Sequence, residues 1–250
     1  MIKNISFIGS GNCATYFALS FKKKNILINN IFSRNKKTGT DLANKVNAEF
    51  INKIEDIKPT DLILVCVHDD DIENIIKLLP NVLIVHTSGS TSITVFKNKL
   101  TYGVIYPLQS LSMDLDNNNV PICIEGSSKK VEEKLIQLTR KISDKIYVLN
   151  SEKRKYLHLT AVIVSNFSNY LYSIAHEILQ NENLDFNILH PLIQHTIDKN
   201  MKQQPFLNQT GPAKRGDLNT IKQHLNLLEN EDYRNLYELL SNNILKKYEK

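Results

Sequence analysis

The stretch IKNISFIGSGNCA, residues 2–14, decides the fold of this chain. Ile5, Phe7 and Ile8 form a short apolar run that is typical of a buried strand. The chain then turns through GSGNCA, residues 9–14, into an apolar helical pattern. This order of strand, G-x-G-x-x-A turn and helix is the fingerprint of a dinucleotide-binding βαβ unit. The alternative is a glycine-rich turn in an α/β domain that binds nothing.

Each residue type in the turn has a physical role. Gly9 permits a tight turn, and Gly11 lets backbone N–H groups approach a pyrophosphate. Ala14 keeps the helix close to the strand, and the helix N-terminus favours negative charge. We therefore expect Gly9, Ser10, Gly11, Asn12 and Ala14 to form the cofactor-binding turn.

The composition is that of an ordinary soluble globular protein, with 42% hydrophobic and 23% charged residues in 250 and a net charge of +5. The lysines are scattered rather than gathered in a basic stripe, so we expect no nucleic-acid partner. Three separated cysteines without a C-x-x-C motif favour a reducing, cytoplasmic location. No apolar stretch reaches the ~20 residues of a membrane span, and no signal peptide is expected.

Short apolar runs alternate with helical patterns over residues 1–150, which predicts a doubly wound, mostly parallel α/β sheet. The predicted strands are 3–8, 27–33, 48–51, 61–67, 82–86, 103–106, 120–124 and 145–149. The predicted helices between them are 11–22, 37–46, 71–79, 91–98 and 128–142. Residues 1–150 are therefore expected to form a dinucleotide-binding domain.

Residues 151–250 are expected to form an all-helical domain. Its first helix, predicted over 152–181, carries apolar residues at helical spacing, and further helices are predicted at 185–203, 217–229 and 231–249. The long apolar helix would bury little if left alone. A partner subunit would cover it, so we expect a homodimer.

The residues after the second strand favour NADP over NAD. An NAD site usually has an acidic residue here for the ribose 2′-hydroxyl, and this chain has Ser33 and Arg34, with Lys36 nearby. These groups suit a 2′-phosphate, although a basic surface turn is the alternative. Val67 and His68 follow the fourth strand and are expected beside the cofactor. The aspartates after His68 are better placed to complement a helix start than to bind a metal, so no metal is predicted.

Histidines provide the candidate acid–base groups. His86 and Ser88, after the fifth strand, are expected to face the nicotinamide and substrate, or else to form an ordinary strand end and turn. His158 and Asn166 lie two turns apart on the long apolar helix and are expected near the substrate. The alternative is that His158 is a structural residue of the core whose ring nitrogens are hydrogen bonded there.

The loop GPAKRGD, residues 211–217, contains several hydrogen-bond donors. It begins with a rigid Gly-Pro turn, and Gly216 interrupts regular structure near its end. Lys214 and Arg215 could hold a carboxylate or phosphate, whereas Asp217 suits a helix N-cap. A surface loop is the alternative.

Five motifs together resemble a known family. They are GSGNCA at 9–14, HTSGS at 86–90, YPLQSLS at 106–112, HLTAVIVSNFSNYLY at 158–172 and GPAKRGD at 211–217. The set resembles the Rossmann-like and DUF2520 domain-containing proteins, distant relatives of F420-dependent NADP oxidoreductases, pyrroline-5-carboxylate reductases and 6-phosphogluconate-type dehydrogenases. The resemblance implies an NADP-binding Rossmann domain and a helical, dimerising C-terminal domain.

One departure from the β-hydroxyacid dehydrogenases matters. They carry a Lys followed four residues later by Asn on the interdomain helix, whereas this chain carries His158 and Val162. Lysine-assisted hydroxyacid oxidation is therefore not expected.

We expect an NADP(H)-dependent oxidoreductase acting on a small polar or anionic molecule in the interdomain cleft. His158 or His86 would move the proton, Asn166 would orient the substrate, and Lys214 and Arg215 would hold an anionic group. The alternative is a non-catalytic dinucleotide-binding sensor or partner-binding dimer. A deazaflavin co-substrate is a further possibility, for which no feature of the sequence specifically calls.

Overall fold

The computed structural model describes residues 1–111 and 119–248, which belong to two compact units, Met1–Asn166 and Phe167–Lys250. Ser112, the last residue of the YPLQSLS motif, and residue 249 of the last predicted helix lie outside the described residues. Each described helix is too short or too polar to span a bilayer.

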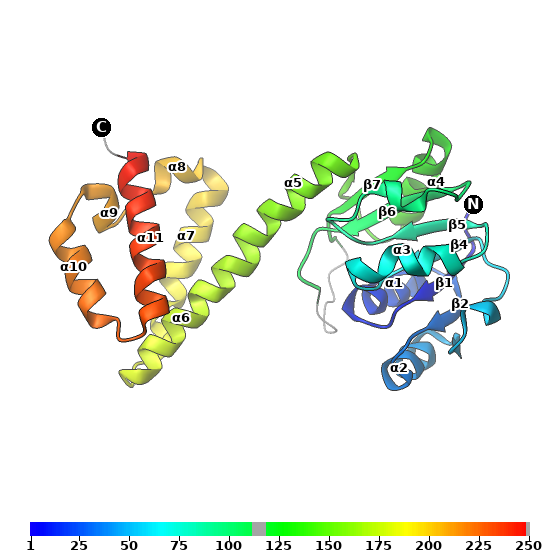
Figure 1. The fold of residues 1–250 in the computed structure, drawn as a ribbon, viewed down its shortest axis with the longest axis horizontal. Helices are drawn as coiled ribbons and strands as arrows, with labels where there is room; N and C mark the ends of the chain where they lie inside the picture. Colours follow the sequence, from blue (N-terminus) through cyan, green and yellow to red (C-terminus); the bar gives the residue numbers. More distant parts are fainter. Residues whose placement is uncertain (112–118, 249–250) are drawn as a thin grey trace. The chain divides into compact units, whose positions relative to one another are not determined.

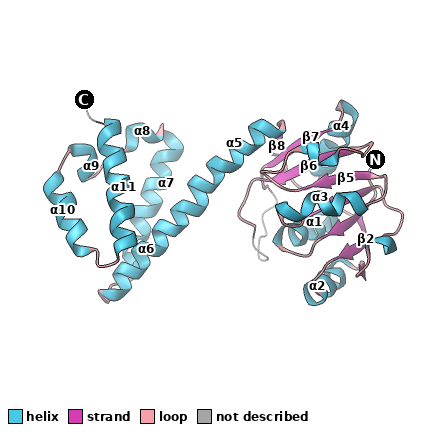
Figure 2. Cartoon of the chain, viewed as in Figure 1, coloured by secondary structure: helices cyan, strands magenta, loops and turns pink. Residues whose placement is uncertain are grey.

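The first unit is built on an eight-stranded sheet (Figures 1 and 2). The strands are β1 (Asn4–Ile8), β2 (Leu27–Phe32), β3 (Glu49–Ile51), β4 (Leu62–Val65), β5 (Leu83–His86), β6 (Tyr102–Pro107), β7 (Ile122–Gly126) and β8 (Ile146–Val148). Their order is β3-β2-β1-β4-β5-β6-β7-β8, and all neighbours are parallel except β6 and β7. The eight predicted strands and the mostly parallel sheet are confirmed.

Both faces of this sheet are covered. Helices α1 (Asn12–Lys23), α2 (Lys36–Val46) and α4 (Lys129–Thr139) pack on one face, and α3 (Asp69–Leu78), η1 (Ile54–Asp56) and η2 (Ile93–Phe96) pack on the other. In β4, Leu62 and Leu64 belong to the first core and Ile63 and Val65 to the second. Because side chains alternate along a strand, a strand covered on both faces is apolar at every position.

The sheet topology places the candidate site. The strand sequence reverses between β1 and β4, which is the switch point where ligands bind in doubly wound sheets. The carboxyl ends of β1, β2, β4, β5 and β6 lie along this same edge, because these strands are parallel.

The predicted long helix is present but is not uniformly α-helical. It comprises α5 (Ser151–Ala161), the π-helical η3 (Val162–Phe167) and α6 (Ser168–Asn181). The remaining elements are η4 (Phe186–Leu189), α7 (His190–Lys202), α8 (Pro205–Asn208), α9 (Pro212–Arg215), α10 (Leu218–Leu227) and α11 (Glu231–Tyr248). Helices α8 and α9 were not predicted, because four residues are too few to show a helical period. The predicted 91–98 helix is only the short 3₁₀ turn η2.

Candidate cofactor and active site

The turn after β1 requires glycine at one position and leaves open space at another. Gly9 has φ = +114°, and a Cβ there would lie 2.1 Å from the Cys66 carbonyl oxygen. A Cβ at Gly11 would meet no atom within 4 Å. Gly11 is also the N-cap of α1, with no side-chain cap and no acidic residue in the first turn. The first N–H groups of α1 are therefore open to an anion.

A cavity of about 510 Å³ lies beside this turn. Eight of the predicted cofactor residues line it: Gly9, Ser10, Gly11, Asn12, Ser33, Arg34, Val67 and His68. Ala14 is fully buried in α1, in contact with the core beneath the turn. Ser88 is not part of this lining. The predicted residues are therefore eight of the 17 described lining residues, and these eight come from the ends of β1, β2 and β4.

Hydroxyl groups and one guanidinium surround the end of the cavity next to β2. Ser10 Oγ hydrogen bonds with Ser33 Oγ at 2.8 Å and with Thr38 Oγ1 at 2.7 Å. The Arg34 guanidinium pairs with the Asp71 carboxylate at 2.6 Å, and the Arg34 side chain is 71% exposed. Asp71 belongs to α3, so no carboxylate stands directly after β2. These groups, together with the open space at Gly11, fit a dinucleotide that carries a 2′-phosphate.

Strand β5 ends in a buried, neutral histidine. His86 has no exposed surface and stacks on Phe96, with 5.5 Å between ring centroids. Burial, reinforced by the charge of Arg154, lowers the pKa of His86 to about 3. Its Nδ1 accepts a hydrogen bond from the Ser88 N–H (3.2 Å). Ser88 Oγ in turn accepts from the Ser90 and Thr91 N–H groups at 3.1 and 2.9 Å, and so shapes the turn.

A second cavity, of about 460 Å³, lies between the β6 end and the helix that follows β8. Both predicted residues His158 and Asn166 line it. His158 and Asn166 are eight residues apart. In a regular α-helix, this spacing would rotate one side chain about 80° around the helix axis relative to the other. The π-helical turn η3 lies between them and has more residues per turn, which reduces this offset.

Tyr106 forms a hydrogen-bonded pair with His158 in this cavity. Tyr106 Oη lies 3.0 Å from His158 Nδ1, and the two rings meet edge to face. Burial raises the pKa of Tyr106 to about 12, so its hydroxyl stays protonated at neutral pH. The contact between Tyr106 and His158 could not be predicted from the sequence, because it spans 52 positions.

The β5 loop touches both cavities. A Cβ at Gly89 would lie 2.7 Å from His158 Nδ1 and 2.8 Å from Tyr106 Cζ. Thr87, two residues earlier, lines the first cavity. The two cavities are thus separated by one short loop, within the first unit.

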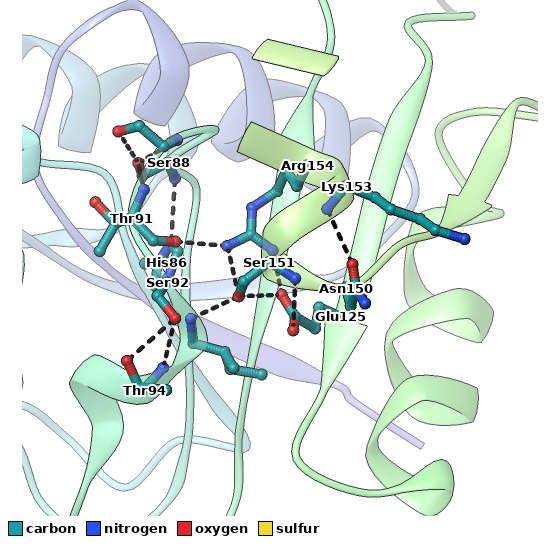
Figure 3. Close-up of polar contacts among 12 residues, drawn as sticks. His86, Ser88, Thr91, Ser92, Thr94, Glu125, Asn150, Ser151, Lys153 and Arg154 are labelled. Carbon is teal, nitrogen blue, oxygen red and sulfur yellow. Dashed lines mark hydrogen bonds and ion pairs between the residues drawn. The ribbon is translucent and has the colours of Figure 1, made fainter. Parts of the chain in front are cut away.

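A buried ion pair fixes the start of α5 (Figure 3). The guanidinium of Arg154, only 1% exposed, pairs with the Glu125 carboxylate of β7 and donates to the Thr91 carbonyl. Glu125 also accepts from the Ser151 N–H (2.9 Å) and hydroxyl (2.8 Å). This network could not be predicted from the sequence, since Arg154 lies in the charged stretch EKRK. It joins α5 to β7 and to the β5 loop.

Two family models match the chain. The model described as "Domain of unknown function (DUF2520)" matches residues 120–244, which is half of the chain. The chain belongs to the DUF2520 family. The model described as "NADP oxidoreductase coenzyme F420-dependent" matches residues 4–89. This match confirms the predicted cofactor, NADP, and the resemblance on which it was partly based.

Solved structures of similar fold cover nearly the whole chain. A Bacteroides fragilis protein described as a "putative NADP oxidoreductase" is 35% identical, with 98% of each chain covered and a TM-score of 0.90. A Thermotoga maritima protein is 25% identical, with 98% of each chain covered and a TM-score of 0.71. A reductive aminase from Aspergillus terreus in complex with NADPH and ethyl levulinate shares the fold at 12% identity, covering 99% and 95%, with a TM-score of 0.74. No protein with a curated description matches.

The cationic loop of the DUF2520 segment lies in the second unit. Lys214 Nζ donates to the Gln209 carbonyl at 2.7 Å and lies 5.3 Å from the centre of the Tyr248 ring. Arg215 is exposed at the end of α9. Asp217 caps α10 by accepting from the Thr220 N–H (3.1 Å), as its position suggested.

Proposed function

We propose that this member of the DUF2520 family is an NADP(H)-dependent oxidoreductase that interconverts a small carbonyl or imine compound with its reduced form. The observation that carries the proposal is the β5 loop. Thr87 faces the cofactor cavity, and Gly89 packs on the Tyr106–His158 pair. A proton-transfer pair one loop away from a dinucleotide cavity is the arrangement that coupled hydride and proton transfer requires.

Different residues of the chain bind different parts of NADP. Gly9 and Gly11 leave the α1 N-terminus open for the pyrophosphate, and Ser33 and Arg34 hold the 2′-phosphate. Val67, His68 and Ser88 shape the loops beside the ribose and nicotinamide. When bound, the reduced cofactor supplies a hydride.

Tyr106 and His158 handle the proton. In the reducing direction, the Tyr106 hydroxyl donates its proton to the substrate oxygen or nitrogen as negative charge develops there. His158 Nδ1, 3.0 Å away, returns a proton to the Tyr106 oxygen. We assign the proton transfer to this pair rather than to His86, because His86 is fully buried and its pKa is lowered to about 3.

The cavity wall favours a substrate of low charge. Its polar groups are amides, hydroxyls and the His158 imidazole, and no Lys, Arg, Asp or Glu is present in the described lining. The lining residues are Tyr106, Leu108, Gln109, Ser110, Leu157, His158, Thr160, Ala161, Val162, Val164, Ser165 and Asn166. Asn166 orients the substrate by hydrogen bonding.

Replacing Arg34 tests the 2′-phosphate assignment. In R34A, the Kd for NADPH should rise about tenfold to a hundredfold, since a charge-assisted hydrogen bond contributes about 1.5–3 kcal/mol. The Kd for NADH should change less than twofold. Fluorescence titration of both nucleotides measures this. The matched control is R140A, which replaces an exposed arginine at the C-cap of α4, outside the cavity lining. Equal losses for the two nucleotides would reject the assignment.

The second unit supports a homodimer. Of its described residues 167–248, only Ala213, Ile221 and Ser241 are buried. Exposed apolar side chains include Phe167 (58%) and Leu171 (40%). A helical unit with so little buried surface is not stable alone, and a second copy is the simplest cover.

The dimer gives an expected mass. Sedimentation equilibrium at micromolar concentration should give twice the chain mass of 28.7 kDa. L171K should shift the equilibrium toward the monomer, because it places a charge in the apolar contact, whereas Q180K on the same helix should not. A weak dimer has a dissociation constant up to about 100 μM. A wild-type protein that is still monomeric at about this concentration would contradict the dimer.

We propose that the two functions of the chain, cofactor binding and substrate binding, divide near residue 150. Helix α5 and η3 supply most of the substrate cavity, so we assign residues 1–150 to cofactor binding and 151–250 to substrate binding and dimerisation. The Tyr106–His158 pair favours an enzyme over a non-catalytic sensor.

The described cysteines are all free, which supports a cytoplasmic location.

A further inference from the structure

Two thiols line the cofactor cavity directly below the glycine turn. Cys13 lies in the first turn of α1, and Cys66 follows β4. Their side chains lie close enough to interact with each other and with Thr87, which lines the same cavity. The Cys66 carbonyl is the group that excludes a side chain at Gly9. The proposed reaction uses neither sulfur.

The two thiols differ in chemistry. The interaction with Cys66 lowers the pKa of Cys13, and burial raises the pKa of Cys66 well above its usual range. Cys13 also lies at the N-terminus of α1, where open N–H groups favour a thiolate. Cys13 is therefore the nucleophile of the pair and Cys66 the resolving thiol.

We propose that hydrogen peroxide converts Cys13 and Cys66 into a reversible disulfide that blocks NADP binding. The Cys13 thiolate attacks one peroxide oxygen, the O–O bond breaks, and Cys13 sulfenic acid and hydroxide form. Cys66 sulfur then attacks the Cys13 sulfur, the S–O bond breaks, and water leaves. The two thiols lose two electrons and two protons in total, and the peroxide is reduced to two water molecules.

The disulfide would act on the part of the fold that binds the pyrophosphate. An S–S bond requires the sulfurs to approach to about 2.05 Å, closer than any hydrogen bond between them. The first turn of α1, which carries Cys13, must therefore move relative to the end of β4. The N–H groups of that turn are the ones left open beside Gly11. This inference rests on the cofactor assignment above.

Peptide mapping and nucleotide titration of the full-length protein test the inference together. The reduced protein is treated with hydrogen peroxide, digested without reductant and examined by mass spectrometry for a peptide that links Cys13 to Cys66. The Kd for NADPH is measured before oxidation, after it and after dithiothreitol. We expect the linked peptide, at least a tenfold rise in Kd and full reversal by dithiothreitol. Bound NADP⁺ should slow cross-linking at least tenfold, because it covers both thiols.

Variants separate the possible causes. C13S should form no link and should keep its own Kd after peroxide, whereas C123A, which lacks the buried thiol of β7, should respond as the wild type does. The absence of the linked peptide, or a linked protein with unchanged affinity, would overturn the inference. Failure of the reduced wild type to bind NADPH would instead refute the cofactor assignment, and the link could still be mapped.

Discussion

Y106F should lower kcat by about 10²–10⁴-fold, the usual contribution of a positioned proton donor. The variant removes the only polar atom of the side chain that lies 3.0 Å from His158 Nδ1 in the substrate cavity. The Kd for NADPH should change less than twofold, because Tyr106 does not line the cofactor cavity. Oxidation of NADPH with a panel of cyclic imines and keto esters measures the rate.

The control for this substitution lies on the same strand. Tyr102 stacks on Phe96, with 5.0 Å between ring centroids, and does not line the substrate cavity. Y102F should therefore keep its kcat. H158N should lose activity to a similar extent as Y106F, and the double variant should lose little more, since the two groups act as a unit. Full activity of Y106F with the best substrate of the panel would show that the proton comes from elsewhere.

R154M should lower the free energy of unfolding by about 3–5 kcal/mol, the usual cost of leaving one buried charge without its partner. Glu125 would then keep its two hydrogen bonds from Ser151 but lose its cation. Urea unfolding monitored by circular dichroism measures the effect. The exposed Lys153 precedes Arg154 on α5, and K153M should change stability by less than about 0.5 kcal/mol.

A double variant distinguishes charge from packing. R154M/E125L removes both charges and should recover most of the lost stability, because a buried ion pair contributes little over apolar side chains of similar volume. A stability of R154M within about 1 kcal/mol of the wild type would mean that Arg154 reaches water in solution.

The sheet could be predicted because its signals are local. A strand covered on both faces, such as Leu62–Val65, is apolar at every position, and the G-x-G-x-x-A turn fixes the first βαβ unit. The antiparallel direction of β7 could not be predicted, since it depends on pairing with β6 rather than on its own residues. The π-helical turn within 162–167 likewise leaves no period that a helical pattern would reveal.

The candidate site could be predicted only where its residues lie directly after strands. Ser33 and Arg34 follow β2 and could be identified by position alone. The partners Tyr106 and His158, Arg154 and Glu125, and Cys13 and Cys66 are distant in sequence, and their contacts depend on the finished fold. For His86, the position at the strand end could be predicted but its surroundings could not. Its burial and neutral state follow from packing against Phe96.

A crystal structure of the reduced protein in complex with NADP⁺ tests the central claim most directly. We predict the pyrophosphate at the N-terminus of α1, the 2′-phosphate beside Ser33 and Arg34, and the nicotinamide ring facing Tyr106. A nicotinamide ring directed away from the cavity lined by Tyr106 and His158 would contradict the proposed oxidoreductase mechanism.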